Sequence, residues 1–293
     1  MNRKLALQVS AYALYALVLA GILLVWKFPY QSLQKRLQSV ASDRLGLRLE
    51  MAVLSPTFPP GVNFRRFSVR PLQSDSPSLF EAGEGQVRIK ILQLLRRRLD
   101  LTIRTFAYGG SVDGKVLLEP YHNEPSFQLS MSWDAVRLHE HPAIANLAGR
   151  ELSGKISGEL QLEGFLNKVR ESTGKGNLLL EEGIFPVNSA YLKTDTLDEV
   201  QVVAETEFAN GKLEIRHCQF EARGFQGDLS GVVTLHPNLS ESTLNLAGKG
   251  KMESGLLNLS TNNSRVAVTF LKQDKPLPFH LRGTLTSPRF SLF

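Results

Sequence analysis

The sequence predicts a mainly β protein, in which a single N-terminal transmembrane helix is followed by a long antiparallel β-sheet with few short helices. Three observations predict this class. A long apolar run opens the chain, apolar and polar residues alternate from residue 47 onward, and glycine-containing turns separate the alternating segments at short intervals. Because the pattern offers no crossover helices between the strands, it excludes a parallel sheet.

Residues 1–28 form the predicted cytoplasmic tip and transmembrane anchor. The apolar run extends from Leu5 to Trp26 and is interrupted by only two polar residues. At about 1.5 Å per residue, a helix of this length crosses a hydrocarbon core of about 30 Å. Arg3 and Lys4 precede the run without an acidic residue nearby, which places the N-terminus in the cytoplasm and the remaining chain outside it.

A cleavable signal peptide is the alternative interpretation of the same run, because Val18 to Gly21 offers small residues of the right kind. The apolar core continues past that point to Trp26, however. It is longer than the roughly 7 to 15 apolar residues of a signal peptide. We therefore expect an uncleaved anchor.

Residues 29–46 form a predicted short amphipathic helix. Phe28-Pro29 ends the membrane helix, because proline cannot continue the hydrogen-bond ladder. Leu33, Leu37 and Val40 then recur at helical spacing among polar residues, and Gly46 stops the helix.

Residues 47–293 form the predicted β-rich domain. In each of its alternating segments, apolar side chains occupy one face of a strand and polar side chains the other. The clearest apolar sets are Val87, Ile89 and Ile91; Leu99, Leu101 and Ile103; Ile156, Leu160 and Leu162; Val200, Val202 and Ala204; Leu213 and Ile215; and Leu229, Val233 and Leu235.

Turn residues between these segments predict antiparallel hairpins and meanders. The predicted turns are Gly109-Gly110, Asp113-Gly114, Asn210-Gly211, Gly224, Gly227 and Pro237-Asn238. One further helix is expected in this part of the chain, around Pro142 to Leu147.

With so few helices, the many one-sided strands must cover their apolar faces in another way. A sandwich of two sheets, a closed barrel, or a curled sheet that leaves an apolar groove would each do so, and periodicity does not separate them.

Composition and charge narrow the class of protein further. The single cysteine, Cys218, allows no intrachain disulfide, and we expect it to be buried rather than redox-active. The net charge of +6 and the pI near 9.4 would suit a nucleic-acid ligand, but the predicted location excludes one. A diffusely basic surface outside the cytoplasm instead faces anionic lipid headgroups or acidic partners, or is simply solvated.

The residues that could carry chemistry do not form a recognisable constellation. His139, Glu140 and His141 come nearest to a metal site, because two histidines two positions apart share a strand face, but no third ligand lies at informative spacing. Pro142 follows directly and favours a surface turn. Two groups of neighbouring carboxylates lie among turn residues without a histidine or nucleophile beside them: Glu181 and Glu182, and Asp195, Asp198 and Glu199.

Motifs for nucleophilic elbows, phosphate loops and dinucleotide binding are missing as well. We therefore predict no catalytic residue, no metal, no cofactor and no enzyme activity. The basic triplet Arg96 to Arg98 has two interpretations, a contact site for headgroups or an acidic partner and a polar hairpin turn, and the turn is favoured.

The order of several glycine-containing segments resembles a known family. They lie behind the anchor and Phe28-Pro29, and the first is Pro60-Gly61-Val62 ahead of a strand; the others are Leu92–Gly114, Asn210–Leu235 and the C-terminal Pro278–Phe293. This arrangement resembles the type II secretion system protein N family and is similar to the broader AsmA-like group of bacterial envelope proteins. Gly109, Gly110, Gly114 and Gly283 are interpreted within it as backbone devices, at a turn or a close contact.

The resemblance implies a bacterial inner-membrane protein with a cytoplasmic N-terminus, one membrane pass and a periplasmic main domain. In the secretion family it implies a non-catalytic component of the type II apparatus, whose partners are inner-membrane lipids and other secretion-system components. The AsmA-like group implies a long, curved sheet with an apolar interior that binds or transports phospholipid acyl chains. This chain departs from the large members of that group in being shorter. The secretion component is the leading expectation, and lipid handling is the alternative.

Overall fold

The computed structural model describes most of the chain after residue 29. The described residues are Tyr12, Tyr15 and Leu19, then 30–57, 61–72, 78–90, 93, 96–119, 124–142, 152–168, 171–186, 193–236, 241–256, 276–285 and 287–292. Among them, no helix has both the length and the apolar character needed to cross a membrane. The predicted span from Leu5 to Trp26 lies outside the described residues at all but three positions, so it stays a prediction.

One short helix precedes the sheet, as the sequence predicts. Helix α2 covers Tyr30–Val40, a π-helical turn follows at Ala41–Leu45, and Gly46 ends it with a positive φ of 64°. Short 3₁₀ turns lie at Leu138–Glu140 and Ser254–Leu256. The helix expected at Pro142 to Leu147 falls on residues outside the described part, apart from Pro142 itself.

Fourteen strands make up almost all of the remaining described chain. They are β1 Leu47–Thr57, β2 Gly61–Pro71, β3 Phe80–Ile89, β4 Leu99–Ala107, β5 Gly110–Glu119, β6 Ser126–Arg137, β7 Ser153–Phe165, β8 Thr173–Pro186, β9 Thr196–Ala209, β10 Lys212–Ala222, β11 Phe225–Thr234, β12 Thr243–Met252, β13 Leu277–Thr284 and β14 Pro288–Leu292.

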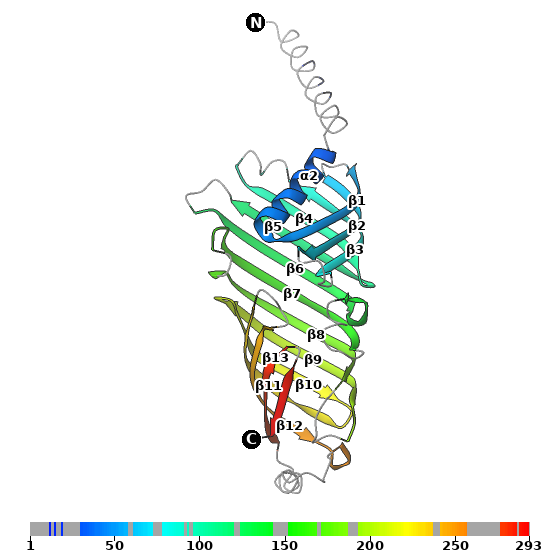
Figure 1. Ribbon diagram of the computed structural model, residues 1–293, viewed down its shortest axis with the longest axis vertical. Helices are drawn as coiled ribbons and strands as arrows, with labels where there is room; N and C mark the ends of the chain where they lie inside the picture. Colours follow the sequence, from blue (N-terminus) through cyan, green and yellow to red (C-terminus); the bar gives the residue numbers. More distant parts are fainter. Residues whose placement is uncertain are drawn as a thin grey trace, which may run out of the picture.

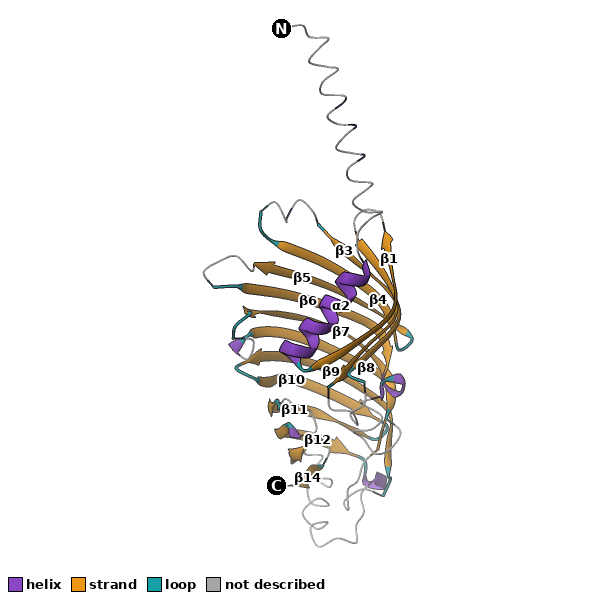
Figure 2. Ribbon diagram, turned by 45° about the horizontal axis from the view of Figure 1, so that its top comes forward, coloured by secondary structure: helices purple, strands orange, loops and turns teal. Residues whose placement is uncertain are grey.

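These strands form a single antiparallel sheet in which each strand pairs with the next along the chain. The sheet is open, since β1 and β14 are its two edges and do not pair with each other. It is long and strongly curved, with α2 at one end and the C-terminal strands at the other (Figure 1, Figure 2). Of the three predicted arrangements, the described strands therefore adopt the curled open sheet, neither a sandwich nor a closed barrel.

The register places apolar residues opposite one another on the same face of twelve consecutive strands. We call this line the apolar row. Starting on β3 and ending on β14, its members are Ile89, Leu101, Val116, Leu129, Leu162, Gly174, Phe208, Leu213, Val233, Leu244, Gly283 and Pro288. The neighbouring row on the opposite face is mostly polar and includes Gln128, Glu163, Thr173 and Lys212. One face of the sheet is thus apolar almost from end to end.

Several β-bulges bend the strands around the apolar face. The register shifts on β6, on β8 and on β10, between Ile215 and Cys218. Ala135 and Glu182, which lie within the first two shifts, have positive φ angles of 52°. An extra residue in one strand bends it and increases the local twist. The sheet therefore curls instead of extending flat.

Glycine has two distinct roles in this fold: some glycines form turns, and others lie inside strands. The sequence pattern distinguished the two only in part. Turns form at Gly109 and at Asn210-Gly211, where positive φ angles fit tight hairpins. The predictions of turns at Asp113-Gly114 and at Gly227 were wrong, because these residues lie inside β5 and β11. Both glycines face the apolar side, but only at Gly227 do neighbouring atoms occupy the space that a Cβ would need; a Cβ at Gly114 would make ordinary contacts of 3.7 Å or more.

Helix α2 covers the first edge of the sheet. The side-chain amide of Gln34 donates a hydrogen bond to the Met51 carbonyl at 2.8 Å, and that of Gln38 donates one to the Leu49 carbonyl at 3.1 Å. Both carbonyls belong to β1, which has no strand on its outer side. Unpaired edge groups invite pairing with other chains, so the helix protects this edge.

We expect the double substitution of Gln34 and Gln38 by alanine to weaken that protection. Loss of two side-chain hydrogen bonds should lower the free energy of unfolding by about 1–3 kcal/mol. The uncovered edge should also promote concentration-dependent association. Urea unfolding and light scattering measure the two effects. Lys35→Ala, an exposed position on the same helix, should change neither; equal behaviour of the two variants would contradict the role of the glutamines.

Candidate functional site

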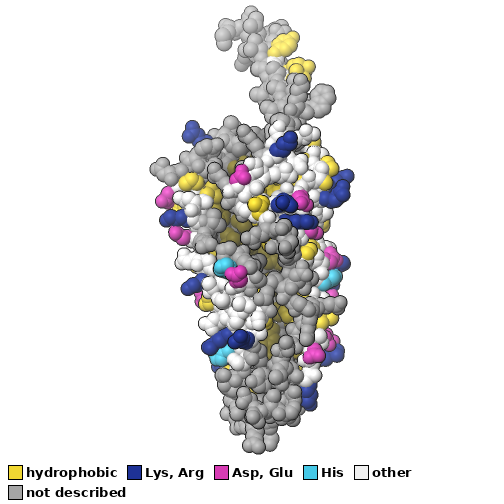
Figure 3. All heavy atoms as spheres, viewed as in Figure 1, with side chains coloured by type: hydrophobic (Ala, Val, Ile, Leu, Met, Phe, Trp, Pro, Cys, Tyr) yellow, Lys and Arg dark blue, Asp and Glu magenta, His cyan; other side chains and the backbone are white. Residues whose placement is uncertain are grey.

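The apolar face lines the hollow side of the curled sheet. Figure 3 looks onto this side, where hydrophobic side chains lie in the depth between flanks that carry charged residues. From β3 to β10, every non-glycine side chain of the apolar row is half-buried, whereas side chains in a covered core would be almost fully buried. No second sheet packs on this face within the described part of the chain. The candidate site is therefore the face itself, an apolar surface that the described residues leave partly accessible.

At the end nearest α2, aromatic rings form part of this surface. Phe64 lies 5.3 Å from Phe67, Phe67 lies 6.2 Å from Phe80, and Phe80 meets Tyr108 edge-on at 6.1 Å between ring centroids. Phe64 is 7% exposed and packs with Ala82 and Ala107 in a small buried cluster. The Tyr108 hydroxyl accepts a hydrogen bond from the Glu81 N–H, and burial raises the pKa of Tyr108.

At the opposite end, three phenylalanines close together occupy the hollow. Phe220, Phe225 and Phe279 lie 4.9 to 6.3 Å apart between ring centroids. Each ring lies over a glycine of a neighbouring strand, so that a Cβ added there would come within 2.6 to 2.8 Å of the ring: Phe279 over Gly248, Phe225 over Gly250 and Phe220 over Gly227. The rings can approach the neighbouring backbone this closely because these glycines carry no side chain.

Cys218 lies on the same face and is buried, as the sequence predicts. It is 6% exposed and sits on β10, opposite Leu229 and Ala204 in the neighbouring strands. Burial raises the pKa of its thiol. Because the thiolate is the reactive form, an elevated pKa makes the cysteine a weak nucleophile at neutral pH.

We expect iodoacetamide to alkylate Cys218 at least about tenfold more slowly in the native protein than in urea. The native rate should continue to rise with pH above the usual cysteine range near 8.5, because the raised pKa leaves less thiolate at every lower pH. Intact mass against time, at several pH values, measures both rates. Similar rates in the native and unfolded chains would show that the thiol is accessible.

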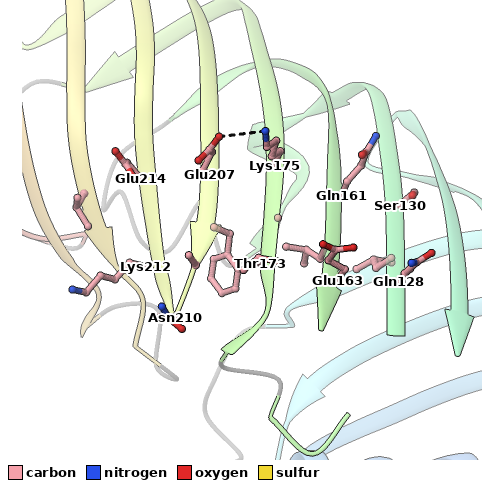
Figure 4. Close-up of a pocket in the computed structure, with 16 residues that line it drawn as sticks. Gln128, Ser130, Gln161, Glu163, Thr173, Lys175, Glu207, Asn210, Lys212 and Glu214 are labelled. Atoms are coloured by element: carbon pink, nitrogen blue, oxygen red, sulfur yellow. Dashed lines mark ion pairs between the residues drawn. The ribbon is translucent and has the colours of Figure 1, made fainter. Parts of the chain in front are cut away.

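The opposite face carries polar side chains and a shallow depression of about 700 Å³. Five polar residues on five consecutive strands lie directly opposite one another across it (Figure 4): Ser130, Gln161, Lys175, Glu207 and Glu214. Glu207 pairs with Lys175 at 3.6 Å and with Arg216 at 2.6 Å. Such cross-strand pairs stabilise a solvated sheet face. The sixteen described residues that line the depression include neither a histidine nor a cysteine.

The structure does not assemble the candidate metal-site residues His139, Glu140 and His141 into a metal site. His139 and Glu140 belong to a 3₁₀ turn, not to the strand on which a shared face was expected. The His141 ring packs 4.8 Å from the Tyr108 ring, and its Nε2 lies 3.1 Å from the Leu79 carbonyl oxygen. Across the described residues, no three potential ligands among His, Cys, Asp and Glu gather at one point.

The neighbouring carboxylates are exposed, as predicted, but the expected turn was wrong for four of them: Glu181 and Glu182 lie in β8, and Asp198 and Glu199 lie in β9. Glu182 pairs with Lys155 at 2.8 Å, and Glu199 pairs with Arg223 at 2.5 Å. Glu181, Asp195 and Asp198 are exposed. These carboxylates therefore lie on the exposed surface, mostly on strands, instead of sharing an enclosed site.

Sequence reasoning missed the two features that shape the candidate site. The apolar row depends on strand register, which alternation alone does not fix. The pairing of phenylalanine with glycine on adjacent strands left a signal, because glycines recur at inward positions of β11 and β12. The sequence pattern predicted a turn at Gly227, and Gly248 and Gly250 were not considered, so the aromatic cluster was not predicted.

The fold and the site together define a class: a single-sheet β protein with one polar face and one continuous, hollow apolar face. No family model, no curated protein and no solved structure matches this chain.

Proposed function

We propose that this chain is a non-catalytic, inner-membrane-anchored protein of the bacterial periplasm that binds lipid acyl chains along its hollow apolar face. The observation that carries the proposal is the apolar row, which continues over twelve strands while its side chains stay half-buried from β3 to β10. Exposed contiguous apolar surface of this kind marks a binding surface. A bound hydrocarbon chain would remove it from water.

The dimensions of the face suit this ligand. Fourteen strands spaced about 4.8 Å apart give a sheet roughly 60 Å long. One leaflet of a bilayer is about 15 Å of hydrocarbon, so acyl chains fit within a fraction of that length. Transfer from the bilayer to the face exchanges one hydrocarbon environment for another. The acyl chain itself therefore gains or loses little hydrophobic free energy, and covering the apolar face favours binding.

Lipid extraction from the purified full-length chain tests the proposal. We expect organic extracts, separated by mass spectrometry, to contain diacyl lipid in near-stoichiometric amount after detergent exchange has removed bulk lipid. A membrane protein with one span, purified in the same way, provides the background. Lipid no greater than this background would contradict acyl-chain binding.

Membership in the type II secretion apparatus stays a prediction from the resemblance. It is compatible with acyl-chain binding in one molecule, because a component of a membrane-embedded machine can also contact lipid. Gentle purification of the full-length chain, with identification of the co-purifying proteins, tests it. Absence of every secretion component, together with normal exoprotein secretion in a deletion strain, would contradict this assignment.

A further inference from the structure

The charges of this chain are unevenly distributed along it. Residues 30–119 contain 14 Lys and Arg against 8 Asp and Glu, whereas residues 120–293 contain 17 against 20. The first part comprises α2 and β1 to β5, which form one end of the elongated molecule (Figure 1). The net positive charge of the chain is therefore concentrated at this end of the molecule, and it is not spread evenly over the surface.

The connection between β3 and β4 carries the densest group of these charges. Lys90 pairs with Asp100 at 2.8 Å, and Arg98 pairs with Glu119 at 2.8 Å. Arg96 and Arg97, at the turn between them, are exposed, and neither side chain makes an ion pair with the described residues. The ion pairs thus hold the base of the turn, and two guanidinium groups remain available to a ligand.

The length of the chain places this turn near the bilayer. Only three residues lie between Trp26, where the predicted span ends, and Tyr30, where α2 begins, so the two are four residue steps apart. Four residue steps reach at most about 14 Å, so the start of α2 lies close to the membrane boundary. The end of β3 and the start of β4, which flank Arg96 and Arg97 in the chain, lie at the same end of the molecule as the start of α2 (Figures 1 and 2).

We propose that Arg96 and Arg97 form a binding site for the phosphate groups of anionic phospholipids in the adjacent leaflet. Guanidinium groups donate paired hydrogen bonds to phosphate oxygens, and basic residues near an anionic surface each add appreciable binding free energy. This inference rests on the proposed membrane placement and is independent of whether acyl chains occupy the hollow face. The site would orient the sheet toward the lipids that the face receives.

Amide hydrogen exchange of the full-length protein in nanodiscs tests the site. We expect residues 90–98 to exchange on the order of tenfold more slowly in discs with 30% phosphatidylglycerol than in discs of phosphatidylcholine alone. High salt should remove the difference, because it screens exposed charges. R96Q/R97Q should abolish the difference. R282Q/R289Q, which removes two exposed arginines from β13 and β14, should preserve it.

Equal exchange in the two discs, or a difference that persists in R96Q/R97Q, would overturn the proposal. An acidic protein partner in place of lipid would give this first outcome. Because the measurement follows the turn and not the amount of bound lipid, its failure is distinguishable from failure of acyl-chain binding. The Thr284–Ser287 turn at the far end supplies an internal reference that should exchange equally in both discs.

Discussion

Replacement of Leu160 by glutamate is expected to lower the amount of co-purifying lipid at least about tenfold. Leu160 lies on the hollow face in the middle of β7, opposite Met131 and Gly176, and it is half-buried. A carboxylate at this point must lose its hydration when an acyl chain covers it, at a cost of several kcal/mol. Lipid extraction and mass spectrometry, with protein quantified in parallel, measure the effect.

Gln161→Glu provides the matched control. Gln161 is the next residue on the same strand and faces the polar side, among the residues that line the depression of Figure 4. The Gln161→Glu substitution introduces the same charge as Leu160→Glu, and we expect it to leave the amount of bound lipid unchanged. Thermal unfolding should show that both variants fold, since each position contacts solvent. Equal lipid content in the two variants would contradict a role of the hollow face.

Replacement of Gly248 by valine is expected to lower the free energy of unfolding by about 2–4 kcal/mol. A Cβ at this position would lie 2.3 Å from the Asp228 carbonyl oxygen and 2.6 Å from Phe279 Cζ. Phe279 is 6% exposed and packs with Phe220 and Phe225, so it cannot move without disturbing the cluster. Urea denaturation with its midpoint and slope measures the loss.

Ala247→Val is the control for this substitution. Ala247 precedes Gly248 on β12, is exposed and faces the opposite side of the sheet. Valine suits a strand, so the control should leave stability unchanged or raise it slightly. If Gly248→Val were as stable as the control, the packing of Phe279 over the glycine would be disproved.

The sequence predicted the local elements of this fold well, because local patterns produce them. Alternation at Leu99, Leu101 and Ile103 follows directly from a strand with one apolar face, and it coincides with β4. The amphipathic helix ahead of residue 47 follows from a period near 3.6. Both signals arise within a few residues, so neighbouring strands do not alter them.

Closure of the sheet could not be predicted in this way. A sandwich, a barrel and an open curl place the same apolar residues on the same face, and they differ in which strands meet across space. Bulges such as the one at Ala135 decide the curvature, yet alanine carries no sequence signal for a positive φ. The candidate site exists only in the open curled sheet. Because alternation fits all three arrangements equally, it could not predict the site.

Glycine caused the clearest errors. Asp113-Gly114 has the composition of a hairpin turn, but it lies within β5, where Gly114 is buried against Ile103 and Met131. A Cβ at Gly114 would make ordinary contacts, whereas at Gly227 the absence of a side chain allows close packing beside Phe220. The composition of a dipeptide shows which backbone conformations it can adopt. The contacts made in the folded sheet decide which of them it does adopt.

Position-specific photocrosslinking in cells tests the central claim most directly. A benzophenone amino acid is introduced on the hollow face at Leu129, Leu160 or Ile215, and on the polar face at the adjacent Gln128, Gln161 or Glu214. After irradiation, mass spectrometry of the purified chain identifies the adducts. Acyl-chain binding predicts lipid adducts at the three hollow-face positions and none at their neighbours. Equal lipid labelling of both faces, or protein adducts alone on the hollow face, would contradict it.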